Sequence, residues 1–397
     1  MEHDRSDTEA LVIGAGPAGL AAAVQLRRRG VDTLVLERSD TVGPSWRERY
    51  DQLRLNSLSW MSAIPHAPMP LRAGRWPTAG AYVEYLEATV ERWGIDVCRV
   101  IEAQRIDSVG PGYEVSTRDR SFRAPSVVVA TGYDRVWHMP DWPGRADFGG
   151  RLIHAAQYRN PDPFIGRDVL VVGCGNTGTE LAVQLARAGA TRVRVGLRTP
   201  PNLMPRQIYG VPVQALGALL RHQPDWLGDA SARLLQRLTW GDLSRFGLLP
   251  APMGVASEIR HKGLGPVVDT GFVDEVRAGR VEIGLTVVGF SGNDVLLADG
   301  TSIRPDVVIA ATGYRHGLED LVGHLGVLTD KGRPQRVDGG ALPHAPGLHF
   351  NGYWLPVTGQ LTAMRATSRR IGRQVARRRR HGARRCGSGV RLEGLAA

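Results

Sequence analysis

The stretch ALVIGAGPAGLAAAVQLRRRGVDTLVLER, residues 10–38, decides how the first part of the chain folds. An apolar run of strand length leads into a glycine-rich turn, an alanine-rich segment follows, and a second apolar run ends the stretch. This order predicts a strand, a tight turn, a helix and a second, parallel strand. The glycines follow the pattern G-x-G-x-x-G, which lets the backbone approach a diphosphate and directs a helix N-terminus at it. The sequence therefore predicts a dinucleotide-binding unit, although a purely structural turn would carry the same glycines.

The residue that ends the second predicted strand supports this interpretation. Glu37 lies 23 residues after Gly14, where a carboxylate accepts hydrogen bonds from ribose hydroxyls. The residues predicted to hold the first nucleotide are Gly14, Gly16, Pro17, Ala18, Gly19, Glu37 and Arg38.

A second copy of the pattern, DVLVVGCGNTGTELAVQLARAGATRVRVGLR, occupies residues 168–198. Its second strand ends in Arg198 and Thr199, with no acid. A carboxylate there would repel a 2′-phosphate, whereas an arginine pairs with it, so this loop favours NADPH over NADH. The alternative is that Arg198 is an ordinary exposed residue of an arginine-rich chain. The residues predicted to hold this nucleotide are Gly173, Gly175, Asn176, Thr177, Gly178, Arg198 and Thr199.

Two later segments resemble each other, SVVVATGYD at residues 126–134 and DGTSIRPDVVIAATGY at residues 299–314. Each is an apolar run of strand length followed by Thr-Gly-Tyr. Gly132 and Gly313 permit close backbone approach there. Such strands return the chain between nucleotide domains, so we predict an α/β fold with two nested Rossmann-like dinucleotide-binding domains.

The basicity of the chain is local. The net charge is +11, but ten arginines lie within residues 369–391, which leaves the rest of the chain near +1. We therefore expect no nucleic-acid partner and interpret residues 381–397 as a basic, disordered tail.

The three cysteines and the apolar N-terminal run exclude other classes. Cys98, Cys174 and Cys386 are isolated, which predicts neither a disulfide framework nor a metal site and fits a reducing, cytoplasmic setting. The run at residues 11–26 is short, broken by glycine and preceded by an acidic leader, so we expect neither a signal peptide nor stable membrane insertion.

A third motif lies between the two loops. In DFGGRLIHAAQYRN, residues 147–160, Phe148, Gly150, His154 and Tyr158 are spaced F-x-G-x-x-x-H-x-x-x-Y. With both loops and both ATG strands, this motif makes the chain resemble the class B flavin-dependent monooxygenases. Among these it resembles the flavin-containing monooxygenases, in which the motif ends in Tyr. Similarity to the YUCCA-type branch extends through RYDQLRLNS, MPRQIYG and GPVVDTGFVDEVRAGRVEI.

The resemblance implies the cofactors FAD and NADPH, with O₂ and a small organic molecule as substrates. NADPH would reduce the flavin, and a flavin C4a-(hydro)peroxide would then transfer one oxygen atom. The resemblance places Asn56 and His154 at the catalytic centre, although YUCCA-type sequences depart from the Asn56 position. Each of these two residues also has a structural interpretation, as a turn cap and as part of an interdomain linker. Trp46 would lie beside the flavin, and Gln360 and Leu361 would open a helix facing it.

The resemblance also implies the division of the chain. We expect an FAD-binding domain at residues 1–160 and 315–380 and an NADPH-binding domain at residues 161–314. A helical insertion at about residues 203–252 would be a substrate lid, a membrane-facing patch or, as we favour, a covering subdomain. A homodimer is possible.

Several functions stay open at this point. A flavin disulfide reductase needs a cysteine pair, which the chain lacks. An NADPH oxidase that releases hydrogen peroxide and a non-enzymatic nucleotide-dependent interaction protein remain as alternatives. Within the monooxygenase interpretation, the sequence leaves N- or S-oxygenation and oxidative decarboxylation of a 2-oxo acid open.

Overall fold

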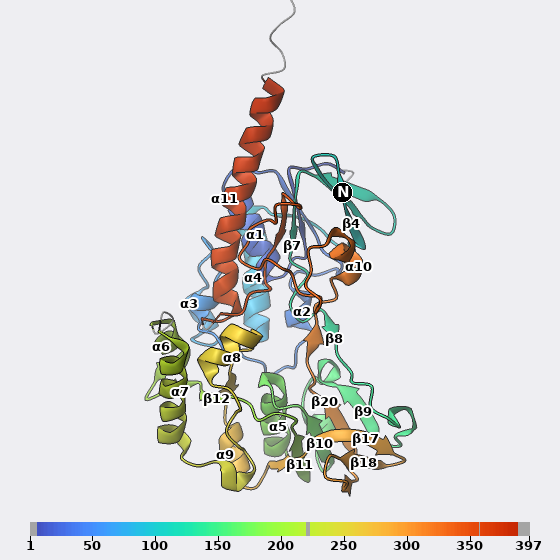
Figure 1. The fold of residues 1–397 in the computed structure, drawn as a ribbon, viewed down its shortest axis with the longest axis vertical. Coiled ribbons are helices and arrows are strands. Elements are labelled where there is room, and N and C mark those ends of the chain that lie inside the picture. Colours follow the sequence, from blue (N-terminus) through green and yellow to red (C-terminus); the bar gives the residue numbers. More distant parts are fainter. Residues whose placement is uncertain (1–5, 220–222, 357, 388–397) are drawn as a thin grey trace, which may run out of the picture.

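The computed structural model describes residues 6–219, 223–356 and 358–387. Figure 1 shows two α/β units stacked along the long axis of the molecule, the first containing both ends of the described chain and the second containing its middle. Each unit has a five-stranded parallel sheet, which confirms the predicted fold class.

The first sheet has the strand order β22-β7-β1-β2-β3. Its strands are β1 (Ala10–Ile13), β2 (Thr33–Leu36), β3 (Asp96–Cys98), β7 (Ser126–Val129) and β22 (Leu348–Phe350). Every residue of β1, β2, β7 and β22 is buried, as expected for a parallel sheet covered on both faces. Ala10 and Val12 pack against helices, whereas Leu11 and Ile13 pack on the opposite face.

Different elements cover the two faces of this sheet. One face is covered by α1 (Pro17–Arg27), α4 (Ala79–Trp93) and α11 (Gln360–Gly387). The other is covered by α10 (Glu319–Val322) and an antiparallel sheet of β4 (Arg105–Val109), β5 (Gly112–Ser116) and β6 (Ser121–Ala124). The short helices α2 (Pro44–Arg47) and α3 (Ser59–Ser62) lie in the segment between β2 and α4.

The second sheet repeats this plan, with the strand order β16-β11-β10-β20-β9. Its strands are β9 (Arg151–His154), β10 (Asp168–Val172), β11 (Arg192–Gly196), β16 (Glu282–Gly284) and β20 (Val307–Ala310). Helices α5 (Asn176–Ala188) and α9 (Phe272–Arg277) cover one face. The antiparallel strands β17 (Val287–Ser291), β18 (Asp294–Leu297) and β19 (Ser302–Ile303) form a small sheet that packs on the other face.

Strand β9 differs from the expected division of the chain. It precedes residue 160, where we placed the boundary, but it pairs in parallel with β20 and is an edge strand of the second sheet. The passages between the two units also pair with each other, because β8 (Val136–Trp137) is antiparallel to β21 (Tyr314–Arg315). The two connections therefore lie side by side at the junction (Figure 1).

The predicted insertion is only partly helical. It begins with β12 (Leu203–Pro205), which pairs with β15 (Val267–Asp269), and the hairpin of β13 (Gln207–Ile208) and β14 (Val211–Pro212). Helices α6 (Val213–Leu219) and α7 (Asp225–Trp240) follow, and α8 (Val255–Lys262) packs on α7. Leu203, Trp240 and Leu248 are buried in the core of the second unit. Among the described residues, four hydrogen bonds join the insertion to the first unit: Arg206 Nη2 donates to Leu55 O, Gln214 Nε2 to Thr358 O, Arg75 Nη2 to Gly210 O and Leu58 N to Gln214 Oε1.

Helix α11 is 28 residues long, about 42 Å at 1.5 Å per residue, and extends beyond the body of the first unit (Figure 1). It packs on α1, and Gly372 allows this approach because a Cβ there would lie 3.0 Å from the carbonyl oxygen of Gln25. The helix continues to Gly387, so residues 381–387 of the predicted disordered tail are helical, and residues 388–397 lie outside the described residues. In the described part of the chain, no helix has both the length and the apolar character needed to cross a membrane.

Candidate active site

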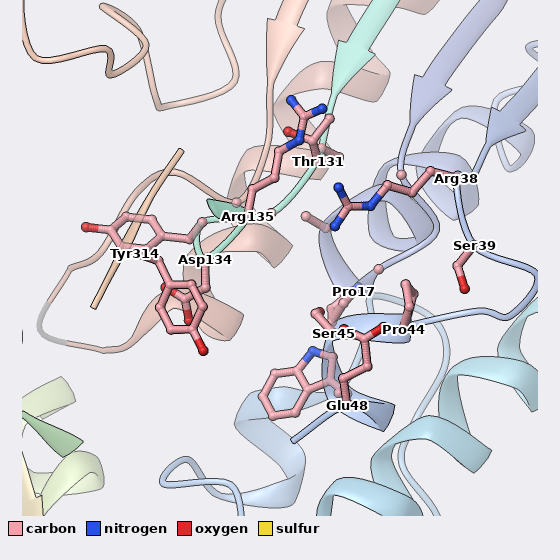
Figure 2. Close-up of a pocket in the computed structure, with 18 of the residues that line it drawn as sticks. Pro17, Arg38, Ser39, Pro44, Ser45, Glu48, Thr131, Asp134, Arg135 and Tyr314 are labelled. Carbon is pink, nitrogen blue, oxygen red and sulfur yellow. The ribbon is translucent and has the colours of Figure 1, made fainter. Parts of the chain in front are cut away.

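A cavity of about 470 Å³ lies between the two units and contains much of the predicted first nucleotide site. Its walls include Gly14 and Gly16 of the first loop, Gly132 after β7, and Thr177 at the start of α5. Figure 2 shows side chains from the segments after β2 and β7, among them Arg38 and Arg135, reaching into this space. One cavity is thus bounded by both nucleotide-binding units.

The first glycine loop is built so that only its middle glycine faces open space. Gly14 has a φ of +106°, and a Cβ on it would lie 2.6 Å from the Ala130 carbonyl oxygen. A Cβ on Gly19 would lie 1.8 Å from the Gly14 carbonyl oxygen, because α1 starts directly against the turn. Gly16 has no atom within 4 Å of the corresponding position and lines the cavity with Pro17 and Ala18. The backbone here leaves room for a diphosphate at the N-terminus of α1.

Glu37 both stabilises this loop and lines the cavity. It is 4% exposed, its Oε2 accepts a hydrogen bond from Ala15 N at 2.7 Å, and its Oε1 accepts one from Ser39 N at 3.0 Å. A carboxylate has four lone-pair sites, so these two bonds leave acceptor capacity for ribose hydroxyls. Arg38 also lines the cavity, and its Nη1 lies 3.9 Å from Glu102 Oε1.

The residues predicted near the flavin ring lie at the same cavity. Trp46 lines it and packs edge-to-face on Tyr82 of α4, with ring centroids 4.8 Å apart. Gln360 and Leu361 line it from the first turn of α11, and Gln360 Nε2 donates to Gly352 O at 2.7 Å. The positive end of the α11 dipole therefore faces the cavity, where it favours negative charge.

The second glycine loop repeats the construction of the first. Gly173 has a φ of +115° and a Cβ on it would lie 2.5 Å from Ala311 O, whereas one on Gly178 would lie 1.9 Å from Gly173 O. Gly175 has no atom within 4 Å of the corresponding position. Asn176 Oδ1 accepts a hydrogen bond from Val268 N at 2.8 Å, which ties the loop to β15.

Arg198 and Thr199 follow β11 and are both exposed. Arg198 makes no hydrogen bond or ion pair with another residue of the described ranges. Its guanidinium is therefore available to an anionic ligand.

His154 is fully buried, is not part of the cavity wall and fixes the interdomain motif. Its Nδ1 accepts a hydrogen bond from Ala156 N at 3.1 Å, so its Nε2 carries the proton and donates to Gly313 O at 3.2 Å. Burial lowers the pKa of His154, which favours this neutral form. Trp137 and Tyr314 pack edge-to-face on its ring. These contacts hold the segment that follows β20 against the end of β9.

The other motif residues also pack. Phe148 contacts Phe290, with ring centroids 4.9 Å apart, and Gly150 leaves room for the Phe148 ring. Tyr158 is buried, lines the cavity and donates to Gln184 Oε1 of α5 at 3.1 Å.

Asn56 lies in a buried polar cluster that crosses the junction. Its Nδ2 donates to Glu180 Oε1 at 3.0 Å, and the hydroxyl of Tyr50 donates to Glu180 Oε2. Burial raises the pKa of Glu180, an effect that these two hydrogen bonds partly offset. Burial and the nearby Glu180 charge raise the pKa of Tyr50. Tyr50 lines the cavity, and Glu180 and Asn56 lie outside its wall.

The predicted site residues do not include several side chains of this site. Arg49 lines the cavity, with Nη2 2.8 Å from Asp134 Oδ2 and Nη1 3.0 Å from the Tyr314 hydroxyl. Burial alone would lower the pKa of Arg49, but the Asp134 carboxylate raises it. Tyr50 and Glu180 were also missed. The polar residues directly after each ATG strand, Asp134 and Tyr314, were a usable signal, because the ends of adjoining strands meet at one sheet edge.

Cys98 and Cys174 are not paired with each other, and both are buried. Burial raises the pKa of Cys174 to about 12, so this thiol stays protonated.

Comparisons with known proteins agree with this geometry. A family model described as pyridine nucleotide-disulphide oxidoreductase matches residues 11–207. The chain is 30% identical over 356 residues to the probable indole-3-pyruvate monooxygenase YUCCA3 of Arabidopsis thaliana, covering 86% of this chain and 81% of that protein. It is 34% identical over 324 residues to indole-3-pyruvate monooxygenase YUCCA1 of Oryza sativa subsp. japonica, covering 80% of each.

A solved structure, the flavin-containing monooxygenase from Stenotrophomonas maltophilia, matches with a TM-score of 0.72 and 25% identity, covering 94% of this chain and 99% of that one. These matches confirm the predicted enzyme class, an FAD-dependent oxidoreductase, and the predicted cofactors FAD and NADPH. The chain belongs to the flavin-dependent monooxygenase family that includes the flavin-containing and YUCCA-type enzymes.

Proposed function

We propose that this protein is an NADPH- and O₂-dependent monooxygenase that inserts one oxygen atom into a small organic substrate. The observation that carries this proposal is the pair of equally built glycine loops, one on each unit, at a cavity whose wall both units supply. A nucleotide on each loop would extend toward the junction, where hydride transfer requires the two to meet.

The first unit would hold FAD. Gly14, Gly16 and Gly19 would cradle its diphosphate at the α1 N-terminus, Glu37 would accept hydrogen bonds from its ribose, and Trp46 would pack beside its ring. When bound, FAD supplies hydride acceptance from NADPH and the activation of O₂. The α11 N-terminus, with Gln360 and Leu361, would stabilise negative charge on the reduced ring.

The second unit would hold NADPH. Gly173, Gly175 and Gly178 would accommodate its diphosphate at the α5 N-terminus, and Thr177 reaches the shared cavity. The exposed Arg198 would pair with the 2′-phosphate, which is the feature that distinguishes NADPH from NADH.

The residues at the junction would keep water away and hold the ring pair in place. Tyr50, Trp137, Tyr158 and Tyr314 contribute aromatic surface to the cavity wall. The bonds from His154 to Ala156 and Gly313 would fix the passage between the units. His154 would thus act by positioning, and Asn56 would hold Glu180 at the junction through its neutral amide.

We propose a 2-oxo acid with an aromatic side chain as the substrate class. This rests on identity of 30% or more, over at least 80% of this chain, to proteins named indole-3-pyruvate monooxygenases. N- or S-oxygenation is the second candidate, because Asn56 stands where the flavin-containing monooxygenases carry a flavin-facing Asn. A cytoplasmic location and a homodimer stay predictions.

The test is a kinetic study of the purified protein. We expect a yellow protein whose flavin is reduced anaerobically by NADPH faster than by NADH. Aryl 2-oxo acids, amines and sulfides would then be screened for NADPH-dependent O₂ consumption, with ¹⁸O₂ to trace the oxygen atom. Incorporation of one ¹⁸O with loss of CO₂ from a 2-oxo acid supports the first candidate.

Other outcomes would contradict the proposal. Quantitative release of hydrogen peroxide with every substrate would identify an NADPH oxidase. A colourless protein that does not bind added FAD would remove the flavin enzyme altogether.

A further inference from the structure

The cluster of Tyr50, Asn56 and Glu180 joins the two units through one buried carboxylate. Glu180 is on α5, one turn beyond Thr177, and is 9% exposed. Tyr50 and Asn56 both come from the first unit, in the segment between α2 and α3. Each oxygen of the carboxylate therefore accepts a hydrogen bond from the other unit.

A carboxylate in this place determines how the amide of Asn56 is oriented. An ionised carboxylate only accepts hydrogen bonds, so it selects the amide nitrogen of Asn56 and turns the carbonyl oxygen away. Asn56 Oδ1 is buried and has no hydrogen-bond partner among the described residues. A buried acceptor without a partner costs free energy, so the hydrogen bond to Glu180, and not a partner for the oxygen, fixes this orientation of the amide.

The neighbouring Arg206 supports a role at the junction. Its Nη2 donates to Leu55 O at 2.6 Å, and its guanidinium lies 4.5 Å from the centre of the Trp76 ring. The segment next to Asn56 is therefore held on a second side by the insertion of the second unit. Burial raises the pKa of Glu180, and the electrostatic interaction with Arg206 offsets part of this effect.

We propose that Glu180 is a positioning residue that holds Tyr50, a residue of the cavity wall, and the Asn56 amide in place, so that a residue of the second unit sets the shape of the cavity on the side of the first unit. The inference rests on the proposed function, because the cavity that Tyr50 lines is the one in which the monooxygenase would bind its nucleotides and substrate. It adds that a residue of the second unit controls a side chain of the first.

An exchange of the amide and the carboxylate between positions 56 and 180 tests this directly. Asn56→Asp places two carboxylates in contact, which disrupts the hydrogen bond. In the double variant Asn56→Asp/Glu180→Gln, the amide nitrogen introduced at position 180 donates to the carboxylate introduced at position 56. The second oxygen of that carboxylate remains an acceptor where Asn56 Oδ1 was. The double variant also leaves the total charge of the cluster unchanged.

The measurement is the rate of hydrogen peroxide release with NADPH and air alone, together with the rate of anaerobic flavin reduction at saturating NADPH. We expect Asn56→Asp to raise peroxide release about tenfold, since misplacing a group by about an ångström has effects of ten- to a hundredfold. Flavin reduction should stay within about twofold of the parent. Adding Glu180→Gln should return peroxide release to within about twofold of the parent.

Glu275 provides the matched control. It is a second buried glutamate of the same unit, 2% exposed, and its partners Arg187 and Arg280 both belong to that unit. Glu275→Gln should lower thermal stability without changing peroxide release. If a variant at position 56 does not fold, Tyr50→Phe removes one of the two bonds to Glu180 and should raise peroxide release about threefold.

Failure of the proposed function and failure of the positioning role of Glu180 would give different results. If the parent protein is not reduced by NADPH, the proposed function fails. If the parent is reduced but the double variant releases as much peroxide as Asn56→Asp or more, the positioning role of Glu180 is wrong. An equal rise in Glu275→Gln would make the effect a general loss of stability and would also overturn the inference.

Discussion

The two glycine loops are nearly the same turn, yet the residues that end their second strands differ. In both loops the first and third glycines are packed against backbone and the middle one is open. In the first unit the strand leads into a buried Glu37, whereas in the second it leads into an exposed Arg198. On the proposed function, the turn would provide the binding of a dinucleotide, and the residue after the strand would determine which dinucleotide binds. Mutations can therefore test nucleotide binding and nucleotide preference separately.

The largest effect should come from filling the packed glycine positions. Gly19→Ala puts a methyl group 1.8 Å from a backbone oxygen, so the loop must shift, at a cost of about 3 kcal/mol or more. We expect this variant to be purified without FAD, with a lowered Tm. Gly178→Ala should instead keep FAD, seen by its visible absorbance, and lose reduction by NADPH. If both variants lost FAD equally, the two loops would not serve separate nucleotides.

The next prediction concerns the strand ends. Arg198→Ala should lower kcat/KM for NADPH roughly tenfold to a hundredfold, because a hydrogen bond to a charged group contributes about 1.5–3 kcal/mol. The kcat/KM for NADH should hardly change, since NADH lacks the 2′-phosphate. Arg192→Ala is the control, because Arg192 lies at the other end of the strand and pairs with Glu282. An unchanged preference for NADPH in the Arg198 variant would assign the 2′-phosphate to other residues.

Each sheet has a buried histidine on an edge strand, His349 on β22 and His154 on β9. The first of them allows the comparison to be extended to the effect of pH on stability. His349 on β22 bonds to Gly339 O, and burial lowers its pKa to about 4. Below pH 6.5 the unfolded chain binds a proton that the folded chain does not, so stability should fall as the pH drops from 7 toward 4. Above pH 7 this contribution is constant.

The free energy of unfolding should fall by on the order of 2 kcal/mol between pH 7 and pH 5 because of His349. His349→Asn keeps a donor for Gly339 O but does not titrate, so its urea-unfolding free energy should depend less on pH than that of the parent. Equal pH dependence in both proteins would mean that other groups, such as the buried carboxylates, account for the acid sensitivity.

The smallest effect should come from Asn56→Ala. The change removes one of the two hydrogen bonds that cross to Glu180 but leaves both glycine loops intact. We expect flavin reduction at the parent rate and a threefold to tenfold rise in peroxide released per NADPH, because the change removes one contact of the cluster and leaves the nucleotide loops in place. Slower reduction with unchanged peroxide release would place Asn56 in hydride transfer instead.

The local features of the fold could be predicted because each depends on residues that lie close together in the sequence. Both loops, their strands and helices, and the helix that begins at Gln360 depend on neighbouring residues. The membership of β9 in the second sheet could not be predicted, because its partner β20 follows about 150 residues later and strand pairing is not encoded within one segment. The continuation of α11 through the arginine-rich segment was missed because charge alone suggested a solvated tail.

The site was predicted in the same uneven way. Gly16, Glu37, Trp46 and Gln360 line the cavity, and each belongs to a motif. Glu180 follows the second loop within an ordinary helix pattern, and only the contact with Tyr50 across the junction makes it notable. Such residues act through partners that are distant in sequence, so a reading of local patterns does not find them.

The nesting of one sheet inside the other has a consequence for how the chain is made. During synthesis from the N-terminus, all five strands of the inserted sheet have been made once residue 310 is added. The sheet of the first unit lacks β22 until residue 350 has been added, and α11, which covers that sheet, ends only at residue 387. The second unit, although it begins later in the chain, can therefore complete its sheet first. The sheet of the first unit stays incomplete until β22 has been synthesised.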